Sequence, residues 1–422
     1  MTAPQNTLRQ RDFIIVLAGQ IISLFGNAIL RFALPLYLLR ETGSAALYGG
    51  VSALSFLPMI ALSLVGGVLA DRVNKRNVMV ALDFGVALLC ALFLLWMDRF
   101  SAAAATAVFL MLLYGASGAY QPAVQASMPA LLRDEALLRA NAAVNMVGTL
   151  DDLVGPVIGG VLFGLWGLRP ILAVSAACFA ASAAMELFLR IPYQKQPRAR
   201  GVFATARLDL AQSWRFMRRD RPALLQVTAV LALFNLTLSA ALVVGVPVIA
   251  VNLLGLSDQA LGVIQGAMGL GGLCGGLAAG VWAKRLCLRH GFYALLACAP
   301  AMLCLTVATL PGMSGAGYVL VLAGCFLAMA AASLFTVHMS AAVQRQTPAH
   351  LVGKVMSVIL SVAMCTQPLG QALYGALFEA LGARACLATL FSAVAAALIS
   401  LYARRALKRL EQENATVFVE NA

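Results

Sequence analysis

The chain has 422 residues, of which 62% are hydrophobic and only 11% are charged, and its formal net charge at pH 7 is +13. Soluble domains usually carry about 25% charged residues, so this composition excludes a soluble globular protein and indicates a membrane protein. The basic residues form no stripe on a polar domain, and we therefore expect no nucleic-acid partner.

Apolar segments long enough to cross a bilayer recur along the whole chain. A membrane-spanning helix needs roughly 20 predominantly apolar residues. The sequence predicts twelve such helices, at residues 13–39, 46–70, 78–98, 102–128, 141–166, 170–190, 222–253, 259–283, 292–311, 316–343, 355–379 and 385–403. The expected fold class is an all-α membrane protein.

Two short motifs occur twice, which indicates an internal duplication. Residues 67–72 read GVLADR and residues 280–285 read GVWAKR. At nearly the same offset, AVQASMPA at residues 123–130 is followed by AVQRQTPA at residues 342–349. The duplication predicts two pseudo-symmetric six-helix bundles, with a site between the copies near the middle of the bilayer. The predicted parts are residues 1–190, a basic linker at 191–221 containing an interfacial amphipathic helix at 208–219, and residues 222–422.

The distribution of basic residues predicts the orientation of the chain. Most of the 30 lysines and arginines fall in segments on one side of the predicted spans. Basic loops stay in the cytoplasm, so we expect both termini to be cytoplasmic, in the inner membrane of a bacterium. We expect a monomer in contact with membrane lipid.

Polar residues inside the spans follow a helical spacing of i, i+3, i+7 and i+11. Residues at these offsets share one face of a helix, so spans 1, 4, 7 and 10 are each predicted to present a polar stripe. The candidate substrate-binding residues on these stripes are Gln20, Asn27, Arg31, Tyr114, Ser117, Gln121, Asn235, Thr336 and Ser340. We interpret the stripes as the lining of a water-filled central cavity; the alternative is hydrogen bonding between scattered polar residues of neighbouring helices.

The deepest ionisable residues suggest how protons could move. Asp151 and Asp152 lie near the middle of span 5, and Arg31 lies at a comparable depth in span 1. Two adjacent carboxylates cannot both be neutralised by one guanidinium, so the hypothesis is that one aspartate carries a proton and Arg31 is its counter-charge. The alternative is a static ion pair between spans 1 and 5. Asp83 and Glu186 are expected to be satisfied near the cytoplasmic interface, with a coupling role as the alternative.

Other chemistry is not indicated. The cysteines form no CxxC pair, and the three histidines lack the spacing of metal ligands. We expect no metal and no cofactor, with the proton gradient as the energy source, and we expect no enzymatic activity because no nucleophile–base constellation occurs.

Span 5 also carries a pattern of small residues that favours close helix packing. Its members are Gly155, Pro156, Gly159 and Gly160. Glycine faces let helix backbones approach closely, so we expect span 5 to pack against span 8, which is glycine-rich along its length.

The loop between spans 2 and 3 carries the most specific motif of the chain. Residues 67–76 read GVLADRVNKR, which resembles the loop 2–3 signature of the major facilitator superfamily. Asn74 replaces the usual second glycine, and asparagine also tolerates the left-handed turn. The resemblance implies a cytoplasmic gate in which Asp71 is attracted to the positive N-terminal end of span 11. The implied gating residues are Gly67, Asp71, Arg72 and Arg76.

Further segments resemble particular branches of the superfamily. Residues 153–160, LVGPVIGG, resemble the span 5 signature of its antiporters, and residues 42–45, 56–58 and 122–141 look most like its macrolide-efflux and enterobactin-export branch. Many drug–proton antiporters of the superfamily have an arginine in span 4, which is absent here between residues 100 and 132. Their coupling mechanism therefore cannot be transferred unchanged.

Together these features predict a secondary active exporter that works by alternating access. The expected partners are protons and a small amphipathic substrate, such as a macrolide-like drug or a siderophore. A lipid or lysophospholipid carrier is the alternative within transport, and a transporter-like receptor that does not transport is the alternative from another class.

Overall fold

A computed structural model of the chain describes residues 3–132, 134–191, 211–282, 291–348 and 351–420. Within these ranges it contains helices and connecting turns, and the described residues include no β-strand. The chain divides into two compact units: Met1–Ala199 with Asp258–Gly262, and Arg200–Ser257 with Val263–Ala422.

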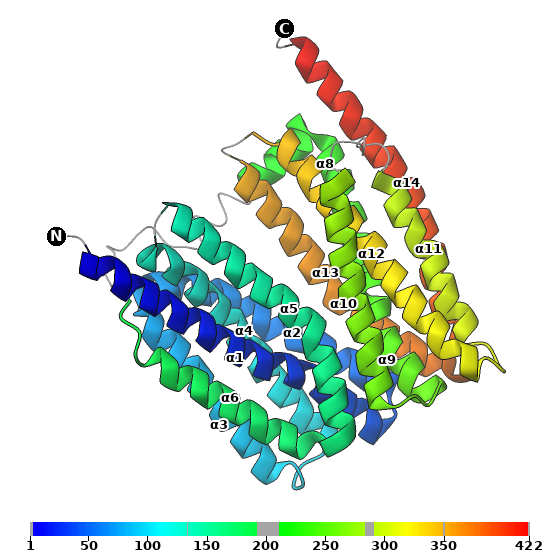
Figure 1. The fold of residues 1–422 in the computed structure, drawn as a ribbon. Helices are drawn as coiled ribbons and strands as arrows, with labels where there is room; N and C mark the ends of the chain where they lie inside the picture. The colour runs from blue at the N-terminus through cyan, green and yellow to red at the C-terminus, as the bar shows by residue number, and fades with distance from the viewer. Residues whose placement is uncertain (1–2, 133, 192–210, 283–290, 349–350, 421–422) are drawn as a thin grey trace. The chain divides into compact units, whose positions relative to one another are not determined.

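The first unit is built from six long helices (Figure 1). They are α1 (Ala3–Thr42), α2 (Ala45–Arg72), α3 (Lys75–Trp96), α4 (Ala102–Leu131), α5 (Asp134–Trp166) and α6 (Leu168–Glu186). Helix α1 packs against α4, α5 and α6, while α3 lies against α4 and α6. The interior of this unit is therefore enclosed by α1, α3, α4 and α6.

The second unit repeats this arrangement with a less regular first span. A π-helical segment η1 (Phe216–Asp220) leads into α8 (Pro222–Phe234), and the span continues through η2 (Asn235–Ser239), η3 (Ala241–Gly245), α9 (Val246–Val248) and η4 (Ile249–Leu253). The remaining elements are α10 (Asp258–Trp282), α11 (Gly291–Ala308), α12 (Ser314–Gln346), α13 (Val352–Leu381), the short 3₁₀ turn η6 (Gly382–Arg384) and α14 (Cys386–Glu420).

The helix contacts of the two units correspond. Helix α6 packs on α1 and α3, and its counterpart α14 packs on α8 and α11; similarly, α3 lies beside α4 and α11 beside α12. Among the described residues, twelve helices are long and apolar enough to cross a membrane. The prediction of twelve spans in two pseudo-symmetric bundles is confirmed.

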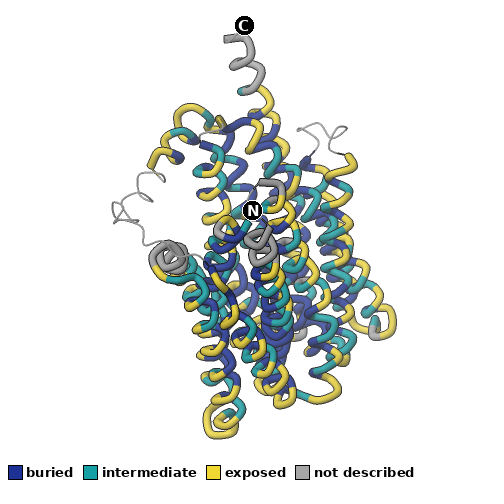
Figure 2. The backbone as a smooth tube through the Cα atoms, turned by 60° about the vertical axis from the view of Figure 1, so that its left-hand side comes forward, coloured by how far each residue is buried: buried dark blue, intermediate teal, exposed yellow. Residues whose placement is uncertain are grey.

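Many residues along the helices are exposed, as the yellow parts of the tube in Figure 2 show, and they include many with large apolar side chains. Leu95, Leu277 and Val281 are 70%, 71% and 77% exposed. In water such faces would be unfavourable, whereas lipid chains solvate them well. The exposed leucines and valines are therefore the lipid-facing surface of a multi-pass membrane protein.

Glycine allows two pairs of helices to approach closely. A Cβ atom on Gly118 of α4 would overlap the carbonyl oxygen of Met59 in α2, and one on Gly275 of α10 would lie 2.9 Å from Cα of Ala330 in α12. Real Cβ atoms do not come that close to backbone, so both positions require glycine.

The start of α8 is held by the far end of the chain. The backbone N–H of Ala223 donates a hydrogen bond of 3.1 Å to Oε1 of Glu413 in α14. The first N–H groups of a helix have no partner within the helix, and a carboxylate there also interacts favourably with the helix dipole.

The predicted amphipathic helix in the linker is described only from residue 211 onward. In this part Trp214 is exposed, while Ser213 and Met217 are buried. One face thus packs on the protein, and the indole of Trp214 remains available to the membrane interface.

Candidate functional site

The polar stripe of α1 lies along the interior of the first unit. Gln20 and Asn27 are buried, at 1% and 8% exposure, and Arg31 is half-buried. Their spacing places them on one face of α1, as the sequence predicted. Asparagine and glutamine at this depth cost free energy in lipid, so a face turned inward is the favourable arrangement.

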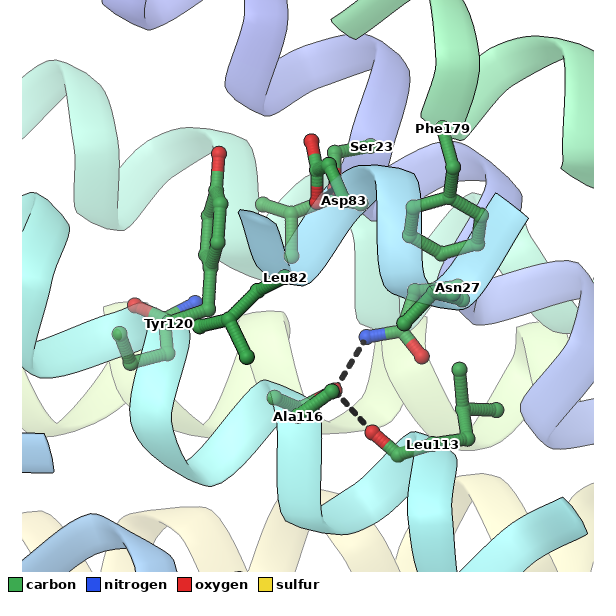
Figure 3. A pocket seen from close by; sticks show the side chains of 12 residues that line it. Ser23, Asn27, Leu82, Asp83, Leu113, Ala116, Tyr120 and Phe179 are labelled. Atoms are coloured by element: carbon green, nitrogen blue, oxygen red, sulfur yellow. Dashed lines mark hydrogen bonds between the residues drawn. The ribbon is translucent and has the colours of Figure 1, made fainter. Parts of the chain in front are cut away.

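The stripe of α4 meets the stripe of α1 directly. Nδ2 of Asn27 donates a hydrogen bond of 3.1 Å to Oγ of Ser117, which in turn donates one of 3.0 Å to the carbonyl of Leu113 (Figure 3). Arg31 lies one turn after Asn27 in α1, and Tyr114 lies one turn before Ser117 in α4. The guanidinium carbon of Arg31 lies 4.5 Å from the ring centroid of Tyr114. The structure thus brings four predicted site residues together in matched pairs.

Aromatic surface extends the Arg31–Tyr114 pair. The ring of Phe56 in α2 lies 5.5 Å from that of Tyr114, in a tilted arrangement. A cation on an aromatic face next to a second ring offers charge, hydrogen bonding and apolar area within one site. This combination suits an amphipathic molecule that has both rings and polar groups.

A small cavity of about 20 Å³ lies beside these residues (Figure 3). Its walls include Asn27, Ser117 and Gln121 from the two stripes, together with Asp83 of α3 and Tyr120 of α4. A space of this size holds about one water molecule, and the polar lining offers it several partners.

Two buried carboxyl groups in the same interior differ from the expectation for them. Asp83 is 3% exposed and accepts a hydrogen bond of 3.0 Å from Oγ of Ser23. Glu186 is completely buried and accepts one of 2.7 Å from the hydroxyl of Tyr120. Oδ2 of Asp83 and Oε2 of Glu186 have no hydrogen-bond partner. The expectation that both groups would be fully satisfied is therefore not met, while their position near the interface stays a prediction.

A signal for this burial was present in the sequence. Asp83 stands four residues after Met79 and three before Val86, on the buried face of α3, and Glu186 continues the buried face of α6 through Phe179 and Ala183. The helical period therefore places both carboxyl groups inside, although each lies toward one end of its span.

In the second unit the predicted stripe residues are not linked to a neighbouring helix in the same way. Asn235 is half-buried and donates to the carbonyl of Leu231, four residues earlier in its own helix, at 3.0 Å. Ser340 is half-buried, and Thr336 is exposed. A polar side chain in a helix can donate to a backbone carbonyl of the preceding turn of its own helix, and Asn235 does so.

The structure describes two of the three residues predicted to couple protons, Arg31 and Asp151. Asp151 is half-buried on α5, and the side chain of Asp152 is outside the described residues. Arg31 contacts the ring of Tyr114. The pairing of Arg31 with an aspartate of α5 stays a prediction.

Of the predicted gating residues, the structure describes the side chain of Arg76. Its Nη1 lies 3.5 Å from the carbonyl oxygen of Leu189, just past the end of α6. The side chains of Gly67, Asp71 and Arg72 are outside the described residues.

Asn74, beside these residues, has a different role from the one inferred for it. Its φ of −60° and ψ of 114° are extended, and its Oδ1 accepts a hydrogen bond of 3.1 Å from the N–H of Arg76. Asn74 is thus the N-cap of α3, and the turn here is not left-handed.

The glycines of α5 face two different neighbours. A Cβ atom on Gly159 would lie 3.1 Å from the ring of Phe32 in α1, and Gly155 meets Ala28 of the same helix. The start of α10, Asp258–Gly262, belongs to the first unit. A Cβ atom on Gly160 would lie 2.8 Å from Cα of Gly262 in this segment, and a Cβ atom on Gly262 would lie 2.9 Å from the carbonyl oxygen of Pro156.

The fold and this interior define a membrane transporter made of two related helical bundles. The model of the Major Facilitator Superfamily matches residues 16–365, and the chain belongs to this superfamily. Its members with this fold are transporters and not enzymes.

Two relatives carry names that describe efflux. The chain is 25% identical over 389 residues to the multidrug efflux pump Tap of Mycolicibacterium fortuitum, covering 90% of this chain and 92% of that protein. It is 26% identical over 181 residues to macrolide efflux protein A of Streptococcus pyogenes. The latter match covers 43% of this chain and 45% of the relative, less than half of either.

Among solved structures, the chain is similar to a bacterial homologue of the human lysosomal transporter Spinster in its inward-facing, unoccupied conformation. The TM-score is 0.73 at 12% identity, and the match covers 98% of this chain and 99% of that one. At this identity the similarity concerns the fold alone.

Proposed function

We propose that this protein exports a bulky amphipathic compound, such as a macrolide-like drug or a siderophore, from the cytoplasm of a bacterium in exchange for protons. The contact between the two polar stripes, with Arg31 on the face of Tyr114 and Asn27 bonded to Ser117, carries the proposal. The names of the efflux relatives support the direction of transport.

The chemistry of the stripes favours this substrate class over a small polyanion. Arg31 is the one cation on them, and its neighbours are amides, hydroxyls and the rings of Tyr114 and Phe56. A sugar phosphate or dicarboxylate would require several cations to compensate its desolvation. A macrolide or aromatic siderophore instead gains from ring contacts and a few hydrogen bonds.

In this proposal the protein sits in the inner membrane with both termini in the cytoplasm, and its two units alternate access to the stripes. Gln20, Gln121, Asn235, Thr336 and Ser340 extend the substrate surface. Gly67, Asp71, Arg72 and Arg76 form the cytoplasmic gate, as the loop 2–3 signature implies.

A susceptibility panel of macrolides and siderophores in an efflux-deficient host tests the proposal. Expression should raise resistance or export for at least one compound, and a protonophore should abolish the gain. Asn27→Ala should reduce the gain, while Asn141→Ala, at an exposed position on α5, should not. Export that persists with the protonophore would contradict proton coupling and favour a lipid carrier.

A further inference from the structure

The interior of the first unit holds two carboxyl groups whose hydrogen bonds go to Ser23 and Tyr120, which lie outside the proposed substrate surface. Asp83 comes from α3 and Glu186 from α6, and both are at least 97% buried, with exposures of 3% and 0%. Both accept hydrogen bonds from hydroxyl groups: Asp83 from Ser23 of α1, and Glu186 from Tyr120 of α4. Four helices therefore meet at this carboxyl pair.

Each carboxyl group has one oxygen that is buried without a partner, Oδ2 in Asp83 and Oε2 in Glu186. The two groups also lie close enough to repel each other electrostatically when both are charged. Two buried negative charges without compensation are strongly unfavourable. A proton held by one of them supplies an O–H donor and removes the repulsion.

Within the part of the chain that the structure describes, the pair has no salt-bridge partner. Among the described residues, no lysine or arginine forms a salt bridge with Asp83 or Glu186. Facing the pair, α4 contributes the phenol of Tyr120, α1 contributes Ser23, and α6 contributes Ser182. Arg76, two turns before Asp83 on α3, points to the carbonyl of Leu189 instead.

A short polar route connects Asp83 to the stripes. The cavity of about 20 Å³ is lined by Asp83, Tyr120 and Gln121, as well as by Asn27 and Ser117 (Figure 3). One water in this cavity would lie between the carboxyl group of Asp83 and the stripe residues. The site for the proton is thus next to the proposed substrate surface but separate from it.

The second copy of the duplicated unit lacks these groups. Met339 stands three residues before the second AVQ motif, as Tyr120 stands three before the first, and it is buried at 1% exposure. The two repeated motifs are offset by 213 and 219 residues. At these offsets from Asp83 and Glu186, residues 296–302 and 399–405 contain no aspartate or glutamate. The bundle therefore packs without a carboxyl pair, so the fold alone does not require one.

We infer that Asp83 and Glu186, with the hydroxyl of Tyr120, form the proton-binding site of this transporter. In the charged state one carboxylate oxygen accepts a proton from a hydronium ion that reaches the cavity through water, which forms an O–H bond and leaves a neutral water molecule; in the reverse step the carboxylic acid returns the proton to water. This assignment rests on the proposed proton coupling, and it differs from the hypothesis that Asp151 or Asp152 carries the proton.

Infrared difference spectroscopy on the purified protein, between acidic and alkaline buffers, tests proton binding without any substrate. The wild type should gain a C=O stretching band of a buried carboxylic acid in acid, and Asp83→Asn and Glu186→Gln should each weaken or remove it. Asp98→Asn, at an exposed residue paired with Arg169, is the matched control and should keep the band. A band that both buried variants retain unchanged would overturn the assignment.

Tyr120→Phe provides the same test with less risk to folding, because it removes only the hydroxyl that donates to Glu186. It should keep the band and shift its pH midpoint. A midpoint equal to that of the wild type would count against the assignment.

Transport in proteoliposomes, with erythromycin as the probe, then separates this inference from the proposed function. Asp83→Asn and Glu186→Gln should lose accumulation driven by a pH gradient and keep exchange down a concentration gradient. A wild type that moves no erythromycin would contradict the macrolide-like substrate, while the infrared result stands by itself. Normal pH-driven accumulation in both variants, with loss in Asp151→Asn, would overturn the inference and support the earlier hypothesis.

Discussion

The guanidinium of Arg31 lies on the ring of Tyr114, and this pair allows a direct test of the substrate surface. Tyr114→Phe keeps the aromatic face, whereas Tyr114→Leu removes it. A cation–π contact contributes about 0.5–2 kcal/mol, so the leucine variant should raise the KM for erythromycin efflux by about two- to thirty-fold. The phenylalanine variant should stay close to the wild type. Equal KM values for both variants would show that the ring face does not matter.

The N-cap of α3 provides a second test at a single residue. Asn74 accepts a bond from the N–H of Arg76 in an extended conformation. Replacement of such a cap by alanine costs about 1 kcal/mol, and replacement by glycine only a few tenths. Thermal unfolding in detergent should therefore rank the variants as wild type, Asn74→Gly and Asn74→Ala, in decreasing stability. A glycine variant more stable than the wild type would contradict the N-cap assignment.

The sequence predicted part of the candidate site at the level of single residues. The spacing of Gln20, Asn27 and Arg31 placed them on one face, because a helix has a fixed period. It did not specify that α4 would supply the partners, since the packing of one helix on another depends on many side chains at once. The helical period also places Asp83 and Glu186 on buried helix faces, but it does not specify which hydroxyl groups they contact.

At the scale of the helical element, glycine determines how closely α10 and α12 pack. A Cβ atom on Gly275 would lie 2.9 Å from Cα of Ala330, whereas on Gly272 the nearest atom is the flexible end of Met329 at 3.9 Å. Overpacking of a rigid contact typically lowers the free energy of unfolding by about 1–3 kcal/mol, and we expect a loss of about this size for Gly275→Ala. Its thermal midpoint and folded yield should fall, while Gly272→Ala, in the same helix, should behave as the wild type. Equal losses in both would indicate a general effect of helix glycines.

The first span of the second unit is the element that sequence predicted least well. Residues 222–253 form one span, as expected, but they change from α-helix to π-helical turns after Phe234. A π turn adds a residue to the helical repeat, and such turns often occur at functional sites. Hydropathy detects the length of an apolar segment and carries no information on this local repeat.

At the scale of the whole molecule, the distribution of basic residues predicts which ends of the helices are cytoplasmic. A fluorescent protein fused after Ala422 should fluoresce. Alkaline phosphatase inserted at Gly312, in the turn between α11 and α12 where φ is 87°, should be active because that turn is predicted to be periplasmic. Activity of phosphatase fused at the C-terminus instead would reverse the predicted topology.

The duplicated architecture was predictable from sequence because repeated motifs occur at matched positions in two apolar halves. The helix contacts within each unit agree with it. The difference in chemistry between the halves was not predictable from the motifs, because the carboxyl pair of the first unit lies outside them.

The bond between Ala223 and Glu413 has a consequence for synthesis of the chain. Its partners are separated by 190 residues, so the acceptor leaves the ribosome only after every span of the second half has been made. The beginning of that half is thus completed by the last stretch to be translated. Truncation before residue 413 should leave an early helix uncapped, and an affinity tag is better tolerated beyond the end of α14 than in place of its final turns.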